Sequence, residues 1–142
     1  MGVGSILAPV FVRVALTLVL LAALGHARVG ALRAGLVRMD EIALGERRWP
    51  TSVQKLANAF HNQLELPVLF YLVVVIALLT RQADVLFVIL SWCFVLMRLV
   101  HAAIHITTNV VAQRFQVFSV GVILLAILWM LLAWRILAGD TP

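Results

Sequence analysis

The sequence predicts an all-α integral membrane protein, an up-and-down bundle of four spanning helices. Composition is the first indication: of 142 residues, 64% are hydrophobic and only 12% are charged, about half the charged share of a soluble domain. The second indication is that the apolar residues gather in four runs, each near the roughly 20 residues that cross a bilayer. Because short connections make neighbouring helices antiparallel, we expect one four-span domain over residues 1–142.

The four runs differ in the charged residues that interrupt them. In chain order, they cover about residues 6–24, 53–79, 85–106 and 117–134. The first contains Arg13, which could snorkel to the surface or pair with Glu65 of a neighbouring span. The second contains Glu65 as its only acidic residue, the third contains Arg98, and the fourth contains no charge. Charged groups inside a bilayer are costly, so their default interpretation is functional.

The basic residues predict the orientation in the membrane. Seven of them lie in the first and third connections: Arg28, Arg33, Arg38, Arg47, Arg48, Lys55 and Arg114. The opposite side has Arg81 and Arg135. The positive-inside rule therefore places loops 1 and 3 in the cytoplasm, as expected for a multi-pass protein of an inner or cytoplasmic membrane. The net charge of +5 does not indicate nucleic-acid binding, because no basic surface is interleaved with aromatic residues.

Two polar stripes interrupt the second and third spans. The first has helical spacing i, i+3, i+4, i+7 and the second i, i+3, i+7; they consist of Asn58, His61, Asn62 and Glu65, and of Arg98, His101 and His105. Such spacing places each set on one helical face. Both sets fall in the cytoplasmic halves of sequential antiparallel helices, and Arg114 follows shortly after. We therefore expect a polar cavity open to the cytoplasm.

Pro67 is expected to shape this cavity. It lies two positions after Glu65 and removes the backbone donor that would otherwise bind the carbonyl of Gln63. A kink in the second span follows, since membrane helices tolerate proline by rearranging locally. A kink beside Glu65 would widen a cavity at that depth.

Two alternatives to a binding cavity remain open on the residues alone. The polar groups could simply satisfy one another, with Glu65 neutralising Arg98, because polar side chains join membrane helices. Alternatively, His101 and His105 at i, i+4 could share a metal ion, with Glu65 or His61 as a further ligand. Arg98 lies one turn from His101, and a fixed cation there favours an anionic ligand over a metal ion.

At these residues the chain resembles the MAPEG family, the membrane-associated proteins in eicosanoid and glutathione metabolism, in its bacterial-type form. Two stretches and Arg114 carry the resemblance: Asn58-Ala-Phe-His-Asn62-Gln-Leu-Glu65-Leu-Pro67-Val-Leu-Phe and Arg98-Leu-Val-His101-Ala-Ala-Ile-His105. The family has Asn-x-x-Glu with a nearby Pro in its second helix and Arg-x-x-(His/Tyr)-x-x-x-Tyr in its third. The likeness covers nearly the whole chain, including the long basic first loop.

The resemblance implies a homotrimer with glutathione as co-substrate in cavities between adjacent subunits, near the cytoplasmic face. A lipophilic electrophile or hydroperoxide would reach the glutathione thiol from the membrane lipid. By position, the residues implied to bind glutathione are Asn58, Asn62, Glu65, Arg98, His101 and His105. Arg114 matches the arginine implied to be catalytic, because a guanidinium favours the nucleophilic thiolate over the thiol.

The chain departs from the family pattern at two positions. Asn58 stands where many members have Arg, and His105 stands where Tyr is common. The resemblance therefore favours a glutathione-dependent transferase or peroxidase. It leaves open a non-catalytic relative that binds lipid or serves as an accessory subunit of a larger membrane complex. A metal- or haem-bearing protein built on His101 and His105 is the third hypothesis.

Overall fold

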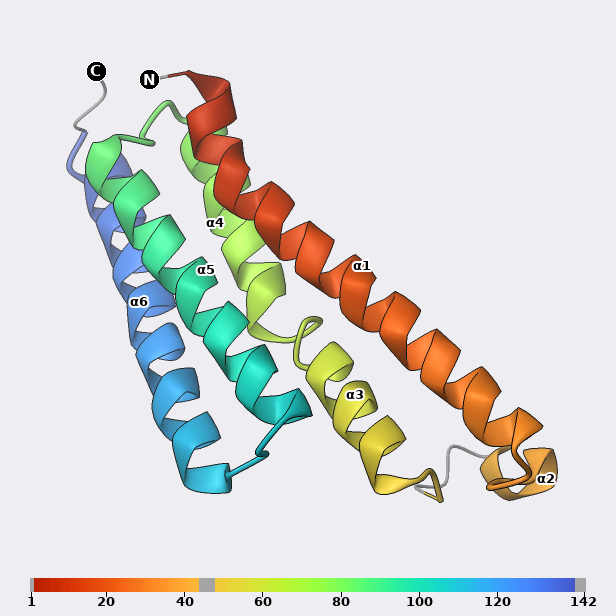
Figure 1. The fold of residues 1–142 in the computed structure, drawn as a ribbon. Helices are drawn as coiled ribbons and strands as arrows, with labels where there is room; N and C mark the ends of the chain where they lie inside the picture. Colours follow the sequence, from red (N-terminus) through yellow and green to blue (C-terminus); the bar gives the residue numbers. More distant parts are fainter. Residues whose placement is uncertain (1, 44–47, 140–142) are drawn as a thin grey trace.

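The computed structural model describes residues 2–43 and 48–139, in which helices joined by short turns and loops are present and no strand is found. The elements are α1 (Val3–Arg33), α2 (Met39–Ile42), α3 (Thr51–His61), α4 (Leu66–Leu79), α5 (Val85–Ile106) and α6 (Val111–Leu137) (Figure 1). Arg47, one of the basic residues counted in the first loop, lies outside the described residues.

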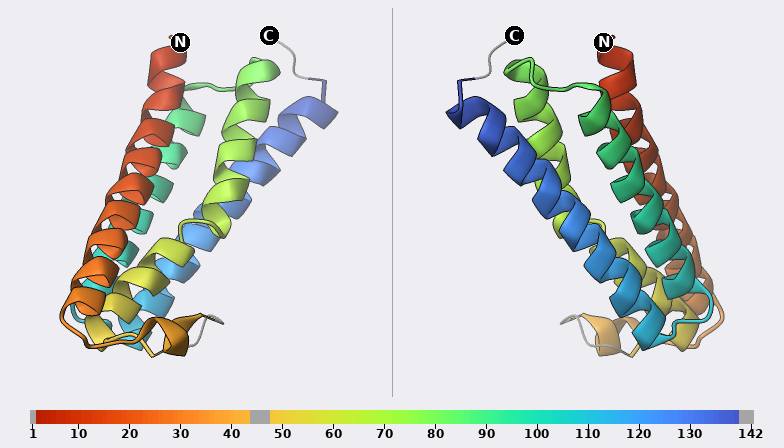
Figure 2. Two further views of the ribbon diagram at one scale, coloured as in Figure 1. Left: turned by 90° about the vertical axis from the view of Figure 1, so that its right-hand side faces the viewer. Right: turned by 90° about the vertical axis from the view of Figure 1, so that its left-hand side faces the viewer.

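Four segments of the described chain are long and apolar enough to cross a membrane. They are α1, α3 together with α4, α5, and α6. The chain runs up and down through them, so that both ends of the described chain lie at one end of the bundle, with α2 and the α5–α6 connection at the other (Figures 1 and 2). The predicted all-α, four-span fold is confirmed, although α1 and α6 extend beyond the predicted spans.

The largest apolar core lies where α4, α5 and α6 pack together, with the start of α1 against them. Phe70 of α4 and Phe94 of α5 stack at its centre with ring centroids 4.7 Å apart, and both side chains are fully buried. Large apolar side chains also cover much of the outer surface, Phe11, Leu18 and Val75 among them. That distribution suits a bundle whose outer faces contact lipid tails.

The second span is two helices rather than one kinked helix. α3 ends at His61, and α4 begins at Leu66 after four non-helical residues. Pro67 occupies the first turn of α4, where a missing backbone donor costs little. The prediction that Asn58 and Glu65 share one helical face is therefore wrong, because the helix that carries Asn58 ends before Glu65.

At the end of the bundle near the termini, Asp84 and Arg135 stabilise the contact between the α4–α5 turn and α6. The Asp84 carboxylate accepts a hydrogen bond from the backbone N–H of Phe87 and so caps α5. Arg135, in the last turns of α6, donates to the same carboxylate at 2.6 Å and to the Gln82 carbonyl at 2.8 Å. The hydrogen bond from Arg135 holds the pKa of Asp84 below its ordinary value. Consequently the α4–α5 turn is joined to the last turns of α6.

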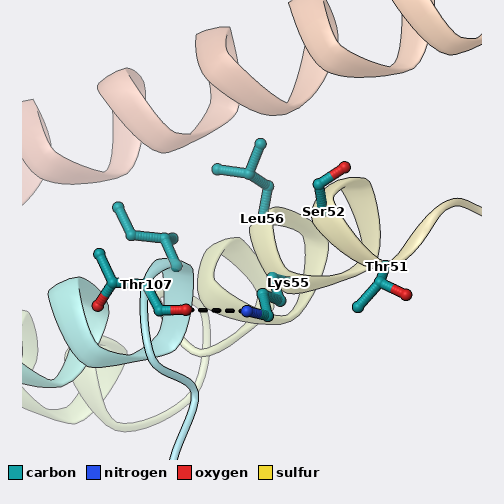
Figure 3. A pocket seen from close by; sticks show the side chains of 6 residues that line it. Thr51, Ser52, Lys55, Leu56 and Thr107 are labelled. Carbon is teal, nitrogen blue, oxygen red and sulfur yellow. Dashed lines mark hydrogen bonds between the residues drawn. The ribbon is translucent and has the colours of Figure 1, made fainter.

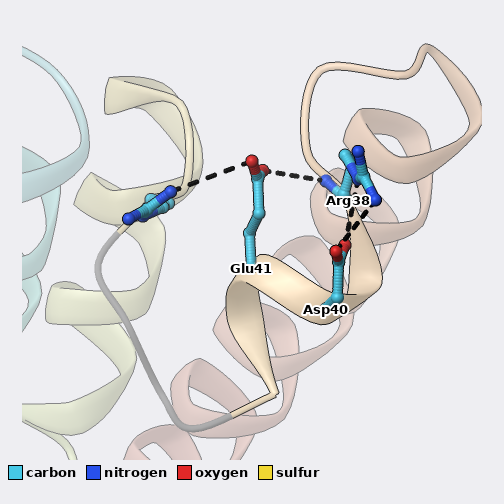
Figure 4. Close-up of polar contacts among 4 residues, drawn as sticks. Arg38, Asp40 and Glu41 are labelled. Carbon is cyan, nitrogen blue, oxygen red and sulfur yellow. Dashed lines mark hydrogen bonds and ion pairs between the residues drawn. The ribbon is translucent and has the colours of Figure 1, made fainter.

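The opposite end is closed by the short helix α2. The Glu41 carboxylate accepts from the backbone N–H of Arg38, and the Arg38 guanidinium pairs with Asp40 at 2.9 Å (Figure 4). Glu41 also lies 3.8 Å from a guanidinium nitrogen of Arg48, which precedes α3. These pairs are exposed, so they orient the loop and contribute little to stability.

Candidate functional site

Four of the predicted polar residues meet in a cavity of about 230 Å³ near the end of the bundle that holds loops 1 and 3. Residues from the end of α3, from α5 and from the beginning of α6 line it: Asn62, His101, His105, Val111, Arg114, Phe115 and Phe118. One part of the lining is therefore amide, imidazole and guanidinium, and the other part is apolar. A ligand with both polar and apolar surface fits such a lining.

His105 lies at the centre of the polar part of the cavity. Its Nε2 atom is 3.1 Å from Nη1 of Arg114 and 3.3 Å from Nδ2 of Asn62. Nδ2 of Asn62 also donates to the Asn58 carbonyl at 2.9 Å, which fixes the orientation of the amide. Because a guanidinium and an amide nitrogen can only donate, Nε2 of His105 must accept. Nδ1 of the same ring lies farther from Nη1 of Arg114, at 3.4 Å, so the shorter contacts to Nε2 favour the neutral imidazole with its proton on Nδ1.

Arg114 reaches the cavity from the first turn of α6. Its Nη1 atom also donates to the Asn109 side-chain carbonyl at 2.8 Å, and Asn109 adopts a left-handed backbone conformation with φ of 56°. Asparagine tolerates that conformation better than most residues, so the α5–α6 turn presents its amide to the guanidinium. The positive end of the α6 dipole adds to the charge of Arg114. The cavity thus favours an anionic group beside Arg114.

Arg98 lies behind the cavity rather than in its wall. Its side chain is buried, and Nη2 donates to the backbone carbonyl of Asn62 at 2.8 Å. That carbonyl is one of the free acceptors at the end of α3, so the guanidinium takes the place of the next helical turn. The Phe118 ring lies 5.7 Å from the same guanidinium. Arg98 therefore positions Asn62 and with it one wall of the cavity.

The break between α3 and α4 has a second support that the sequence does not reveal. Nη1 of Arg13, on α1, donates to Oε1 of Gln63 at 2.7 Å, and Nε2 of Gln63 donates to the Ala59 carbonyl at 2.7 Å. Gln63 is an uncharged residue next to the polar stripe, and its spacing alone does not distinguish it. Arg13 is fully buried, so it neither snorkels nor contacts the surface.

The remaining predicted residues lie away from the cavity wall. The side-chain carbonyl of Asn58 accepts a hydrogen bond of 2.8 Å from Nε2 of Gln54, which lies one turn earlier in α3. Glu65 is exposed, and its carboxylate has no hydrogen-bond or ion-pair partner among the described residues. His61 is exposed beside Phe60. Glu65 therefore does not form the predicted ion pair with Arg98 within one chain.

No three His, Cys, Asp or Glu side chains come close enough to share a metal ion in the part of the chain that the structure describes. His101 and His105 approach edge to face, with ring centroids 5.6 Å apart. The third ligand considered from the sequence was Glu65 or His61. Neither residue lines the cavity that the two imidazoles share.

A second cavity, of about 420 Å³, lies between the beginning of α3 and the end of α5. Its lining consists of Thr51, Ser52, Lys55, Leu56, Ile106 and Thr107. The Lys55 ammonium donates to the Thr107 carbonyl at 2.8 Å and so joins the two helices (Figure 3). This cavity supplies a cation one turn from Asn58, on the same side of the bundle as Arg114.

The fold and the site together define a helical, multi-pass membrane protein with a small basic cavity at one end of its bundle. The chain belongs to the MAPEG family, whose profile matches residues 6–134. Comparison with curated proteins and with solved structures gave no match. Membership of the family supports a glutathione-related membrane transferase or peroxidase class in general.

Proposed function

We propose that this protein is a membrane-bound glutathione-dependent transferase or peroxidase that acts on lipophilic electrophiles or hydroperoxides. One observation carries the proposal: the Arg114 guanidinium lies inside the cavity, 3.1 Å from the accepting nitrogen of His105. A guanidinium there favours a thiolate over a thiol, and the thiolate is the reactive form of glutathione. Arg114 is the catalytic residue in this proposal.

The chemistry of the lining suits the two reactants. Glutathione carries carboxylates, an ammonium group and a thiol, and the cavity offers the amide of Asn62 and the imidazoles of His101 and His105. Phe115 is 70% exposed and lines the same cavity, so an apolar reactant dissolved in the bilayer can approach along it. The site therefore joins a polar ligand to an apolar one.

The proposed transfer step is a nucleophilic substitution or the opening of an epoxide. The thiolate sulfur forms a bond to the electrophilic carbon, and the bond from that carbon to its leaving group or epoxide oxygen breaks. The electron pair leaves on that group, which takes a proton from water. With a hydroperoxide, sulfur attacks the outer oxygen and the O–O bond breaks, which gives a glutathione sulfenic acid and an alkoxide that takes a proton from water. The thiol of a second glutathione then attacks the sulfenic sulfur, which gives the disulfide and water. Arg114 contributes by holding the negative charge on sulfur before the attack.

The size of the cavity supports a site completed by a second copy. A volume of about 230 Å³ is below the roughly 300–1,000 Å³ of ligand pockets. We propose a homotrimer in which the exposed Glu65 and the nearby Asn58 bind glutathione at the boundary between copies. Glu65 then meets the glutathione ammonium, and Arg98 acts through Asn62. The whole chain forms one four-span domain, with loops 1 and 3 and the cavity on the cytoplasmic side.

The test of binding is a calorimetric titration of glutathione into the purified protein. We expect saturable binding that Asn62→Ala weakens about tenfold, since the amide of Asn62 orients His105 and faces the cavity. Arg81→Ala is the matched control, because Arg81 lies at the opposite end of the bundle. The absence of any binding at millimolar glutathione would contradict the proposal.

A second candidate function is a non-catalytic member that binds lipid or assists a larger membrane complex. Asn58 favours it, because this residue pairs with Gln54 and brings no positive charge of its own to a glutathione carboxylate. Lys55 is the nearest replacement. Lipid retained through purification, together with no glutathione binding, would support this second function.

A further inference from the structure

Two arginines lie inside the bundle at the break between α3 and α4. The relative exposed areas of Arg13 and Arg98 are 0% and 1%. Each makes one hydrogen bond to the broken segment, Arg13 to the side chain of Gln63 and Arg98 to the backbone of Asn62. Four further nitrogens, Nε and Nη2 of Arg13 and Nε and Nη1 of Arg98, are buried without a partner in the structure.

The described part of the chain supplies no buried negative charge to balance them. None of its acidic residues is buried. Glu65 attracts Arg98 electrostatically, but its carboxylate is exposed and forms no ion pair with that guanidinium. Gln63 brings a neutral amide to Arg13, and both polar atoms of that amide are already bonded. A buried charge without a counter-charge costs several kcal/mol in a protein interior, so the arrangement calls for an anion.

A ligand in the cavity beside Arg114 does not meet this need. The lining of that cavity includes neither Arg13 nor Gln63 nor Arg98. Arg98 lies between α5 and α6, with Phe118 and Gly121 beside it, and Arg13 reaches the break between α3 and α4 from α1. The anion that balances them must therefore be separate from glutathione.

We propose that Arg13, Gln63 and Arg98 form an internal binding site for a small monovalent anion of the chloride class. Complete burial of both side chains selects a small anion, and a single charge limits the desolvation cost that a phosphate or sulfate would carry. The guanidinium groups supply only N–H donors, which a halide accepts. Bound there, the anion holds the break in place. Through the bond from Arg98 to the Asn62 carbonyl, it also fixes a wall of the cavity.

The experiment measures the Tm of the purified full chain in potassium chloride, bromide or nitrate, against potassium gluconate of the same ionic strength. A ligand that binds only the folded state raises its stability in a saturable manner. We expect the three small anions to raise the Tm by several degrees over gluconate. Gln63→Glu places a carboxylate beside Arg13 without changing the shape of the side chain, so it abolishes this response and keeps the Tm in gluconate high.

Gln116→Glu is the matched control, because it makes the same chemical change at an exposed position of α6 and keeps the response. Arg13→Met is the second test variant, and it loses the response because one of the two cations is gone. Crystals grown in bromide give a direct measurement: an anomalous peak beside Arg13 and Arg98 is expected. Equal Tm values in chloride and gluconate, a Gln63→Glu variant that responds like the parent, or no bromide peak would each overturn the proposal. None of these measurements involves glutathione.

Discussion

The guanidinium of Arg98 donates a hydrogen bond of 2.8 Å to the backbone carbonyl of Asn62, and this bond joins α5 to the broken second span. The break lies at the depth of the cavity, where a free carbonyl would otherwise face an apolar interior. Arg98 removes that cost and keeps Asn62 in the wall beside His105. In the polar stripe of α5, Arg98 thus holds Asn62 in place, whereas His101 and His105 line the cavity themselves.

Arg98→Met tests the role of this bond. The variant leaves the Asn62 carbonyl without a donor, which costs about 1–3 kcal/mol for a buried group. We expect amide hydrogen exchange in the segment that joins α3 to α4 to accelerate roughly tenfold or more. Arg135→Met, which removes a guanidinium at the other end of the bundle, serves as the control. Unchanged exchange in that segment in Arg98→Met would show that the break does not depend on Arg98.

The hydrogen bonds around His105 predict its tautomer. Both Asn62 and Arg114 present donors to Nε2, so we expect nitrogen NMR of the labelled protein at neutral pH to show a neutral ring protonated on Nδ1. Arg114→Ala removes one donor and shifts the Nε2 signal toward that of a free acceptor. Observation of the Nε2–H tautomer in the parent protein would contradict the assigned geometry.

The pair of Asp84 and Arg135 predicts a dependence of stability on pH. The hydrogen bond from Arg135 lowers the pKa of Asp84, so the ionised form stabilises the folded state above the unfolded pKa of about 4. This contribution is lost as the pH falls through the lowered pKa of the folded protein. Because the Asp84 side chain is 50% exposed, we expect less than about 1 kcal/mol.

The measurement for this pair is the Tm of the parent and of Asp84→Asn between pH 7 and pH 3. Asparagine retains the capping oxygen for Phe87 but cannot change its charge. The difference in Tm between the two proteins should therefore shrink as the pH falls. A difference that stays constant or grows toward pH 3 would refute the role assigned to the ion pair.

Gly121 of α6 packs against the side chain of Arg98. A methyl group built at Gly121 would lie 3.8 Å from Cδ of Arg98, an ordinary contact, so Gly121→Ala should fold with the cavity intact. Gly121→Leu should displace Arg98 and weaken glutathione binding several-fold. Calorimetric titration of glutathione into both variants measures this difference. Equal affinities for glutathione in the two variants would argue against the close packing of Gly121 and Arg98.

The sequence predicts the four spans because hydropathy depends on each segment alone. It also predicts that Asn62, His101, His105 and Arg114 lie near one another, since all four fall at one depth on neighbouring helices. The full break in the second span could not be predicted, because Pro67 alone is compatible with a simple kink. The break also depends on donors from Arg98 and Arg13 in other helices.

Two further contacts show where the sequence pattern is insufficient. The position of Glu65 depends on where α3 ends, so a stripe drawn on a continuous helix places it on the wrong face. The partner of Arg13 is the neutral Gln63, and no charge pattern distinguishes that residue. The contact between Gln54 and Asn58 is different, because its i, i+4 spacing was visible in the sequence.

The central claim is that Arg114 holds a glutathione thiolate in the cavity beside His105. The most direct test is the ultraviolet difference spectrum of the purified protein at saturating glutathione, with Arg114→Ala and Arg114→Lys alongside. The account predicts a thiolate band in the parent, a weaker band in Arg114→Lys, and none in Arg114→Ala even where glutathione still binds. A band of equal intensity in the parent and Arg114→Ala, or bound glutathione without a thiolate band in the parent, would contradict the account.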